Sequence, residues 1–418
     1  MNLKIALVVL FLLLSSRTDS LALEKCDTCH SIQLVGVHAT VECVDCHSDA
    51  GRGQGAISAQ KTAAKGCVNC HQNYDHIFRQ QMTTKTKEKA FVHSTYEQKD
   101  PEFYQKNCQS CHVTDCLDCH GGDGHRIERP RGNACLPCHK GYFVGPDYYG
   151  KAPKEDSIRY QRGPKIGADF YLKMRPDIHA DSGMTCADCH TMQSLISGQK
   201  SARSCSDCHQ PSKKVIEHQI MAHLEKMECY ACHSAWAAQE YGTFFLRVGN
   251  SKSREYFRVK QDEKSEYIKS SYLKRQDAPP LGRNRAGKIS PIRPQFISFW
   301  SDIRENQPNQ EENVLLIAQW KAFFPHTIQR GTPMCDDCHF NPRRFLLEPD
   351  EDKIYYLEKD GIPLKSFWNQ EGQIIKNGTF LTAQEFQSLA KKTPQFTKAY
   401  VKKWENLINH VETSSPKE

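Results

Sequence analysis

The sequence has few apolar residues for its length. Only 38% of its 418 residues are hydrophobic, and no apolar run after residue 14 approaches the roughly 20 residues that a transmembrane helix needs. The 20 cysteines are too many for an ordinary intracellular enzyme, and they are spread too widely for a small disulfide scaffold. Something other than a conventional apolar core must organise this chain.

No cysteine stands alone. Every one belongs to a Cys-x-x-Cys-His motif, and the motif occurs ten times where chance would give far less than one copy. This motif is the attachment signature of c-type haem, because two thiols on one turn can add to the two vinyl groups of the porphyrin. We therefore expect ten covalent c-type haems, attached in chain order at Cys26 and Cys29, Cys43 and Cys46, Cys67 and Cys70, Cys108 and Cys111, Cys116 and Cys119, Cys135 and Cys138, Cys186 and Cys189, Cys205 and Cys208, Cys229 and Cys232, and Cys335 and Cys338.

The histidine that ends each motif is expected to be the proximal ligand of the haem iron. Disulfides, a thioredoxin-like redox pair or zinc sites would also use paired cysteines, but none of them explains a histidine after every second cysteine. The ten proximal ligands are then His30, His47, His71, His112, His120, His139, His190, His209, His233 and His339.

The remaining nine histidines are candidate distal ligands. They are His38, His76, His93, His125, His179, His218, His223, His326 and His410. His410 lies near the end of the expected last helix and could instead be a charge partner of the helix C-terminus. His218 and His223 are five residues apart, so on a helix their imidazoles diverge and should ligate different irons.

Nine spare histidines cannot complete ten bis-histidine haems. At least one iron must have a methionine, a lysine, another ligand or nothing at its sixth position. The sequence does not choose among the possible substitutes, which are Met82, Met174, Met184, Met192, Met221, Met227, Met334 and Lys173.

The N-terminus is typical of an export signal. Lys4 precedes an apolar run from Ile5 to Leu14, and cleavage after Ala22 fits the small residues there. The alternative is an uncleaved anchor. Because c-type haem is attached outside the bacterial cytoplasm, we expect an exported protein without a membrane span in the mature chain. The periplasm is the expected location, with the cell surface or the medium as alternatives.

The net charge of +7 would normally suggest nucleic acid as a partner. Each haem, however, adds two propionates against one excess positive charge of ferric iron. The loaded protein should be mildly acidic, and we expect no nucleic-acid partner.

Nine motifs lie within residues 23–241, which leaves little polypeptide between them. We expect a mainly α and irregular multihaem cytochrome c fold, in which short helices wrap stacked haems and a small β-containing region follows towards the C-terminus. The tyrosine- and arginine-rich stretch 140–185 is read as a lid over haem faces or as an oxyanion pocket.

The expected organisation is a signal peptide at 1–22, a nine-haem domain at 23–241, a non-haem insert at 242–329, and a last region at 330–418 with the tenth haem. The insert is predicted to contain strands at 243–248, 255–260 and 295–300 and a helix at 311–324. The last region should contain hairpins at 353–368 and 373–382, a helix opened by the capping box of Thr382 and Glu385, and a helix beginning after Thr393. The apolar stripe of that last helix is interpreted first as core packing and second as a haem contact.

Three stretches, 119–150, 228–247 and 323–351, resemble exported multihaem cytochromes that are encoded with selenite and tellurite reduction clusters in metal-respiring bacteria. Octahaem tetrathionate and hydroxylamine-type enzymes are more distant in style, and the chain has no Cys-x-x-Cys-Lys attachment site. The resemblance implies anaerobic respiration with metals or oxyanions.

Two functions are compatible with these residues. The first is electron transfer from haem to haem, between inner-membrane quinol oxidases, periplasmic cytochromes or an outer-membrane conduit. The second is reduction of a small oxyanion such as selenite, tellurite, tetrathionate or nitrite at a haem without a histidine sixth ligand. The first is favoured, since no clear catalytic pocket is evident in the sequence.

Overall fold

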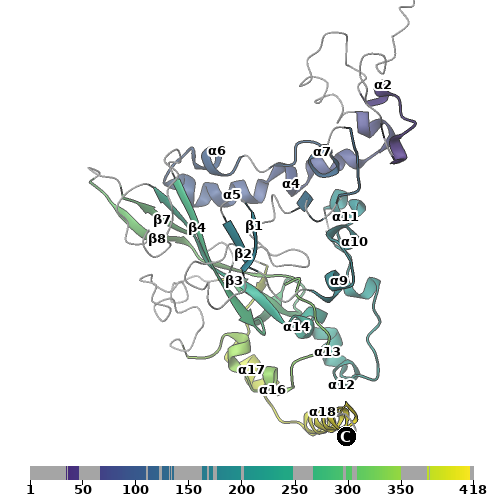
Figure 1. Ribbon diagram of the computed structural model, residues 1–418. Helices are drawn as coiled ribbons and strands as arrows, with labels where there is room; N and C mark the ends of the chain where they lie inside the picture. Colours follow the sequence, from purple (N-terminus) through teal and green to yellow (C-terminus); the bar gives the residue numbers. More distant parts are fainter. Residues whose placement is uncertain are drawn as a thin grey trace, which may run out of the picture. The chain divides into compact units, whose positions relative to one another are not determined.

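The computed structural model describes residues 34, 36–46, 66–109, 112–121, 125–130, 132, 134–135, 162–166, 169–172, 177–198, 202–247, 267–294, 298–303, 308–349, 374–375 and 377–414 (Figure 1). The chain forms two compact units, residues 1–78 with 113–130 and residues 79–112 with 131–418. The expected signal peptide lies outside the described residues. The expected boundary at 241/242 falls inside a strand, β3, and the domain limits stay predictions.

The first unit is built from short helical segments that surround the second, third and fifth motifs. They are η2 (Gly36–His38), α2 (Cys43–Cys46), η3 (Tyr74–Arg79), whose last residue belongs to the second unit, and α7 (Leu117–His120). Segments this short are marginal as isolated helices, so they depend on what packs against them.

The second unit also contains many short helices. These are α4 (Gln81–Thr84), α5 (Thr86–Ser94), η4 (Tyr96–Gln98), α6 (Phe103–Asn107), α9 (Ile178–Asp181), α10 (Cys186–Cys189), α11 (Met192–Ser197), η5 (Cys205–Asp207), α12 (Ile216–Gln219), α13 (Met221–Lys226), α14 (Cys229–His233), α16 (Asp336–His339), η6 (Pro342–Phe345), α17 (Ala383–Leu389) and the long α18 (Pro394–Ser414). Among the described residues, no helix combines the length and the apolar character that crossing a bilayer requires.

The second unit has more strand than the sequence predicted. A four-stranded sheet runs in the order β4-β3-β7-β8 and a five-stranded sheet in the order β10-β9-β6-β5-β11, while β1 and β2 form an antiparallel pair. Most neighbours are antiparallel, but β3 pairs parallel with β7 and β10 pairs parallel with β9. The strands are β1 (Arg162–Ile166), β2 (Asp169–Leu172), β3 (Trp236–Arg247), β4 (Tyr267–Asp277), β5 (Leu281–Asn284), β6 (Ile289–Pro294), β7 (Ser298–Asp302), β8 (Glu311–Ile317), β9 (Gln319–Ala322), β10 (Ile374–Ile375) and β11 (Gly378–Thr379).

An aromatic cluster fixes α5 and α6 against the four-stranded sheet (Figure 1). Phe103 is fully buried and stacks on Tyr96 with ring centres 4.6 Å apart. Tyr267 of β4 and Trp300 of β7 meet Phe103 edge-on at 5.4 and 6.0 Å. Offset and edge-on aromatic contacts add to the burial of their large apolar area, so α6 is held rigidly.

A second core joins the ninth and tenth motifs to the five-stranded sheet. Ala231 of α14 packs with Leu281, Ile289, Phe345 and Leu381. Arg344 is buried beside this core and donates to the carbonyls of Ala231 and Pro279. Because Ala231 lies inside the ninth motif, this core sets the position of α14.

Two of the sequence-based predictions are wrong. Residues 311–324 form β8 and β9 instead of a helix, because β8 pairs with β7 and β9 with β6. Residues 373–382 do not form a hairpin, since β10 pairs with β9 and β11 with β5. The side chain of Asn377 bonds to the backbone N–H and carbonyl of Ala322, so a long-range contact replaces the expected local turn.

Other local predictions fare better. The predicted strands at 243–248 and 295–300 overlap β3 and β7. The capping box of Thr382 and Glu385 opens α17, and α18 begins after Thr393, whose hydroxyl accepts from the Phe396 N–H; both predictions are confirmed. The strand expected at 255–260 and the hairpin expected at 353–368 lie outside the described residues, as does most of the stretch 140–185.

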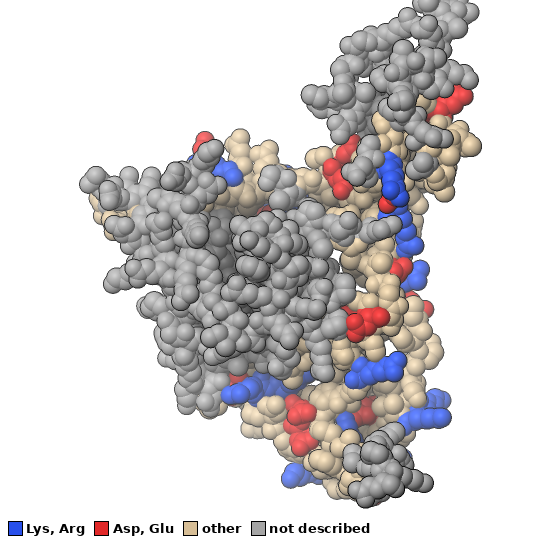
Figure 2. Space-filling view, viewed as in Figure 1, with Lys and Arg blue, Asp and Glu red and all other residues tan. Residues whose placement is uncertain are grey.

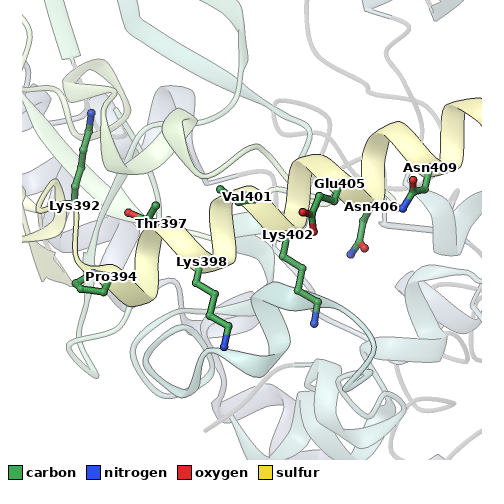
Figure 3. A pocket seen from close by; sticks show the side chains of 9 residues that line it. All are labelled: Lys392, Pro394, Thr397, Lys398, Val401, Lys402, Glu405, Asn406 and Asn409. Carbon is green, nitrogen blue, oxygen red and sulfur yellow. The ribbon is translucent and has the colours of Figure 1, made fainter.

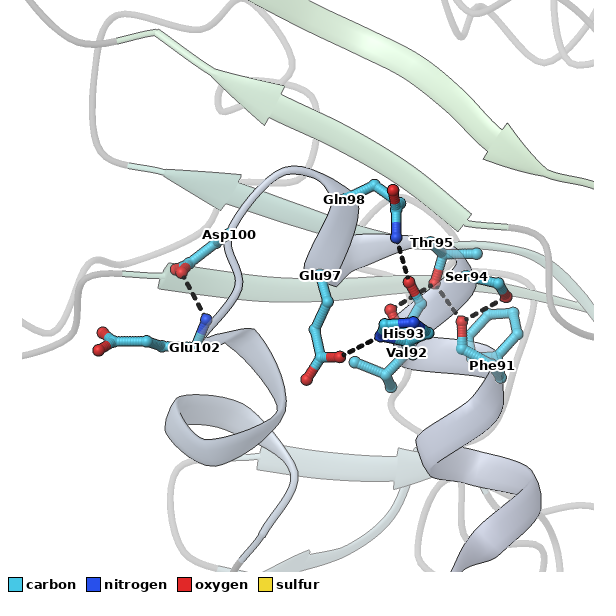
Figure 4. Close-up of polar contacts among 9 residues, drawn as sticks. All are labelled: Phe91, Val92, His93, Ser94, Thr95, Glu97, Gln98, Asp100 and Glu102. Carbon is cyan, nitrogen blue, oxygen red and sulfur yellow. Dashed lines mark hydrogen bonds and ion pairs between the residues drawn. The ribbon is translucent and has the colours of Figure 1, made fainter.

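A buried carboxylate, Asp100, ties the link between α5 and α6 to the sheet (Figure 4). It accepts hydrogen bonds from the Tyr267 hydroxyl at 2.5 Å, the Lys106 ammonium at 3.0 Å and the Glu102 N–H at 3.0 Å. Burial alone would raise the pKa of Asp100, but the bonds from Tyr267 and Lys106 outweigh it and hold the pKa below its usual range.

We predict that Asp100→Asn destabilises the second unit by about 3 kcal/mol at pH 7, because it removes the charge that Lys106 and Tyr267 compensate. The folded pKa is the lower one, so this contribution is complete above the unfolded value of about 3.9 and is lost as the pH falls through the folded pKa. Urea unfolding followed by circular dichroism should show the two proteins converging in acid. The exposed neighbour Glu102→Gln is the matched control and should change stability by less than about 0.5 kcal/mol. An equal effect of both variants at pH 7 would contradict the prediction.

Candidate haem-binding site

A single helical turn organises five of the described motifs, those that end at His71, His120, His190, His209 and His339. The N–H of the motif histidine donates to the carbonyl of the first cysteine, as in His71 to Cys67 at 2.8 Å and His190 to Cys186 at 2.8 Å. This bond between residues four apart places the histidine one turn beyond the first cysteine. A motif therefore presents its thiols and its imidazole from one compact element.

Five motifs carry an aspartate directly before the second cysteine. This aspartate caps the N-terminal end of the helical turn. Its carboxylate accepts from the backbone N–H three residues earlier, which satisfies a donor that the helix leaves free. These aspartates are Asp45, Asp118, Asp188, Asp207 and Asp337. This Cys-x-Asp-Cys-His pattern is a further signal of the motif turn that can be recognised in the sequence.

The structure brings ten of the candidate histidines together in five pairs. Every pair joins one motif histidine with one of the nine others. The ring centres lie 6.2 Å apart for His38 and His71, 5.8 Å for His179 and His209, 6.3 Å for His190 and His326, 6.1 Å for His218 and His233, and 6.2 Å for His223 and His339.

These separations fit an iron between the two rings. Metal–imidazole bonds of about 2 Å on opposite sides of one metal, together with the distance from each nitrogen to its ring centre, give ring centres about 6 Å apart. Among the described residues, no group of three or more His, Cys, Asp or Glu side chains forms a metal cage. Two opposed imidazoles are the protein's share of a haem site, because the porphyrin supplies the other four nitrogens.

Backbone carbonyls orient several of these imidazoles. Nδ1 of His112, His120, His218, His233 and His339 faces a carbonyl oxygen, at 3.1, 3.0, 3.3, 3.3 and 2.6 Å respectively. A carbonyl can only accept, so Nδ1 carries the proton and the lone pair lies on Nε2. Nδ1 of His179 meets the Asp177 carboxylate at 2.8 Å in the same manner. Such partners are typical of metal-binding histidines.

Two distal candidates are half-buried, with their Nδ1 atoms shielded from solvent. Burial and the facing His190 together lower the pKa of His326 to about 4. Burial also lowers the pKa of His223, with His339 adding to the shift. His326 has a φ of 56°, which is uncommon for a residue with a side chain and marks a position that its surroundings over-determine. Both rings are neutral at neutral pH, the form that binds metal.

His218 and His223 face different motif histidines, His233 and His339. The single helix considered from the sequence is not formed. His218 lies in α12, which ends at Gln219, and His223 lies in α13, which begins at Met221.

One motif histidine faces a tyrosine. The Tyr104 hydroxyl lies 3.0 Å from His112 Nε2, and the ring centres are 6.2 Å apart. Burial raises the pKa of Tyr104, with Glu88 and Cys108 adding to the shift, so the hydroxyl keeps its proton and donates to Nε2. Sequence reasoning missed Tyr104, whose signal is its place four residues, or one helical turn, before Cys108.

The other candidates are distributed as follows. His93 lies in α5 with its Nδ1 3.1 Å from Glu97 (Figure 4), and 77% of its side chain is exposed. His76 lies in η3 and His410 lies in α18. His125 lies two residues before Ile127, which forms an isolated β-bridge with Gly121. Cys26, Cys29, His30, His47, Cys111, Cys138 and His139 lie outside the described residues.

Thiols of different motifs contact each other. The first cysteines of the third and fifth motifs, Cys67 and Cys116, share a hydrogen bond that lowers the pKa of Cys67 to about 7. In the second unit, the same contact joins the sixth and seventh motifs through Cys135 and Cys186, and lowers the pKa of Cys186 to about 6.

Further contacts continue along the second unit. Cys205 and Cys229 join the eighth and ninth motifs by a hydrogen bond that lowers the pKa of Cys229 to about 6. The second cysteines complete the series. Burial raises the pKa of Cys189 and of Cys232, and the shift is increased by the nearby Cys208 and Cys338, respectively. Motifs six to ten are therefore consecutive neighbours: hydrogen bonds link first cysteines, and electrostatic effects show that the second cysteines lie near each other.

The N-terminal part of helix α18 packs against the tenth motif. Phe396 contacts the His339 ring at 4.9 Å and stacks on Tyr400. Trp404 and Leu407 are 41% and 46% exposed, so the predicted core packing is wrong for this half of the stripe. An open groove of about 760 Å³ runs along another face of α18 (Figure 3). Its lining contains lysines and amides but neither imidazole nor thiol.

Charged side chains of both signs are interspersed over the face of the second unit shown in Figure 2. A partly buried ion pair of Lys403 and Glu217 attaches α18 to α12 next to His218. Burial raises the pKa of Glu217, but the bond from Lys403 outweighs it and the pKa is lowered.

Comparison with known proteins gives one family. Residues 162–251 match the model of the class III cytochrome c family. This range contains the seventh, eighth and ninth motifs, and the similarity of this segment to class III cytochromes c supports covalent c-type haem and electron transfer there. No curated protein and no solved structure matches the chain.

Proposed function

We propose that this protein is a ten-haem c-type cytochrome that carries electrons by transfer from haem to haem. The observation that carries the proposal is the set of five imidazole pairs at 5.8 to 6.3 Å, each of which joins a motif histidine to a histidine from elsewhere in the chain. The class III match at residues 162–251 supports the same conclusion for that segment.

Two imidazoles on one iron leave no position for a substrate. A bis-histidine haem supplies one-electron oxidation and reduction without binding another molecule. The protein's contribution is to orient several of the imidazoles through carbonyl partners, which tunes the potential of the iron.

The contacts between motifs support a route for the electrons within the second unit. Because thioether edges of neighbouring haems would meet where the thiols meet, the order of transfer is haem six, seven, eight, nine and ten. In the first unit, the contact of Cys67 with Cys116 supports transfer between haems three and five.

The setting is proposed from the sequence. The N-terminal export signal supports a periplasmic or extracellular location, and the resemblance of three stretches to exported multihaem cytochromes supports a role in anaerobic respiration with metals or oxyanions. Its partners would be inner-membrane quinol oxidases, periplasmic cytochromes or an outer-membrane conduit.

Potentiometric titration of the purified protein tests this function. We expect reversible one-electron steps spread over a broad range of potentials, since burial and neighbouring irons shift each centre differently. With an artificial donor, we expect no saturable turnover of selenite, tellurite, tetrathionate or nitrite. Saturable turnover that carbon monoxide blocks would show an oxyanion reductase instead.

A further inference from the structure

The histidines leave one haem short of a ligand. The five pairs use His38, His179, His218, His223 and His326 as distal partners. Five haems then still need a sixth ligand: haems one, two, four, five and six. Only four histidines are left for them, which are His76, His93, His125 and His410. At least one of these five haems must have a sixth ligand that is not histidine.

Tyr104 faces His112, the proximal histidine of haem four, on the side where the sixth ligand would lie. Haem four is the haem expected at Cys108 and Cys111. The ring centre of Tyr104 lies 6.2 Å from that of His112, and its hydroxyl points at the imidazole. Its oxygen lies 3.0 Å from Nε2, the atom whose lone pair would bind iron, because Nδ1 donates to the Thr83 carbonyl. Two ligands on opposite sides of one iron are about 4 Å apart, so a shift of about 1 Å would admit the metal.

The position of Tyr104 is set by the rigid part of the unit. It follows Phe103, which is fully buried in the aromatic cluster, and its ring packs against that cluster. Its carbonyl accepts from the Cys108 N–H at 2.8 Å, so one short helix carries both the tyrosine and the first thiol.

We propose that Tyr104 is the sixth ligand of haem four, which makes this centre a histidine–tyrosinate haem among bis-histidine neighbours. The proposal rests on the proposed function, because it requires a haem at Cys108 and Cys111. Binding of ferric iron releases the phenol proton to water and forms the iron–oxygen bond, with no change of oxidation state. Tyrosinate is a known haem ligand and stabilises ferric iron.

The test is resonance Raman and low-temperature EPR spectroscopy of the ferric ten-haem protein. We expect phenolate vibrations enhanced through one iron and a high-spin signal equivalent to one haem. Tyr104→Phe should abolish the phenolate vibrations, and Tyr104→His should replace the high-spin signal by a low-spin one. Tyr74→Phe is the matched control, since Tyr74 stacks flat on His71 at 5.7 Å while His38 faces that ring. It should leave every signal unchanged.

Several outcomes would overturn the assignment. Ten low-spin irons in the unmodified protein, or phenolate vibrations that persist in Tyr104→Phe, exclude Tyr104 as the ligand while leaving the proposed electron transfer intact. Fewer than ten haems by mass, with free thiols at motifs other than the fourth, would contradict the proposed function alone. Free thiols at Cys108 and Cys111 would overturn both.

Discussion

Replacing His326 by alanine should open the iron of haem seven, which is attached at Cys186 and Cys189. His326 is the imidazole that faces His190, with ring centres 6.3 Å apart. Its removal leaves a buried vacancy on one side of the iron, while the two thioethers and His190 still hold the haem. We expect one low-spin signal to be lost, one new carbon monoxide-binding iron, and a change in the potential of that haem on the order of 100 mV.

Two controls separate the ligand from the fold. Added imidazole should enter the vacancy and restore the low-spin signal. His326→Met keeps a ligand and should give a low-spin iron of higher potential, since methionine raises the potential of a histidine-ligated haem. If His326→Ala leaves all signals and the carbon monoxide titration unchanged, then His326 does not bind iron and the pairing inferred from ring geometry fails.

Removing haem eight should divide the electron route of the second unit. Cys205→Ala together with Cys208→Ala prevents its attachment, and haem eight is the neighbour of both haem seven and haem nine through these two cysteines. The protein would be fixed to a gold electrode through Lys392→Cys, because Lys392 lies over the Phe340 ring next to the tenth motif. In fast-scan voltammetry, only haems nine and ten should continue to exchange electrons rapidly.

The matched control removes haem six instead, by Cys135→Ala with Cys138→Ala. Haem six is the end of the series of contacts in the second unit, so its loss should not interrupt transfer from haem ten to haem seven. Equal fast responses of the two double variants would contradict the proposed order of transfer.

The sequence alone predicts the local parts of the site. Ten motifs define the thiols and motif histidines, and the capping pattern of Thr382 and Glu385 defines the start of α17. Such features depend on neighbours in the chain and can be recognised from spacing. The pairing of histidines cannot, because His326 faces His190 across more than a hundred residues, while the tenth motif lies only nine residues beyond it.

The strands show the same limit. Residues 311–324 look helical by their apolar spacing, yet β8 and β9 form because β7 and β6 offer edges to pair with. Tyr104 was also missed, since its place one helical turn before Cys108 gains a meaning only when the fold brings its hydroxyl to His112. For β8 and β9, pairing with other strands overrides the local pattern.

The most direct test of the account is the intact mass of the exported protein under denaturing conditions. We predict the mass of a chain that begins at Leu23 with ten covalently bound haems and no free thiol. The contacting thiols of Cys67 with Cys116, Cys135 with Cys186, and Cys205 with Cys229 could alternatively form disulfides in a protein without haem. A mass equal to that of the polypeptide without haem, reduced by two hydrogens for each disulfide, would show that no haem is covalently bound and would contradict the prediction.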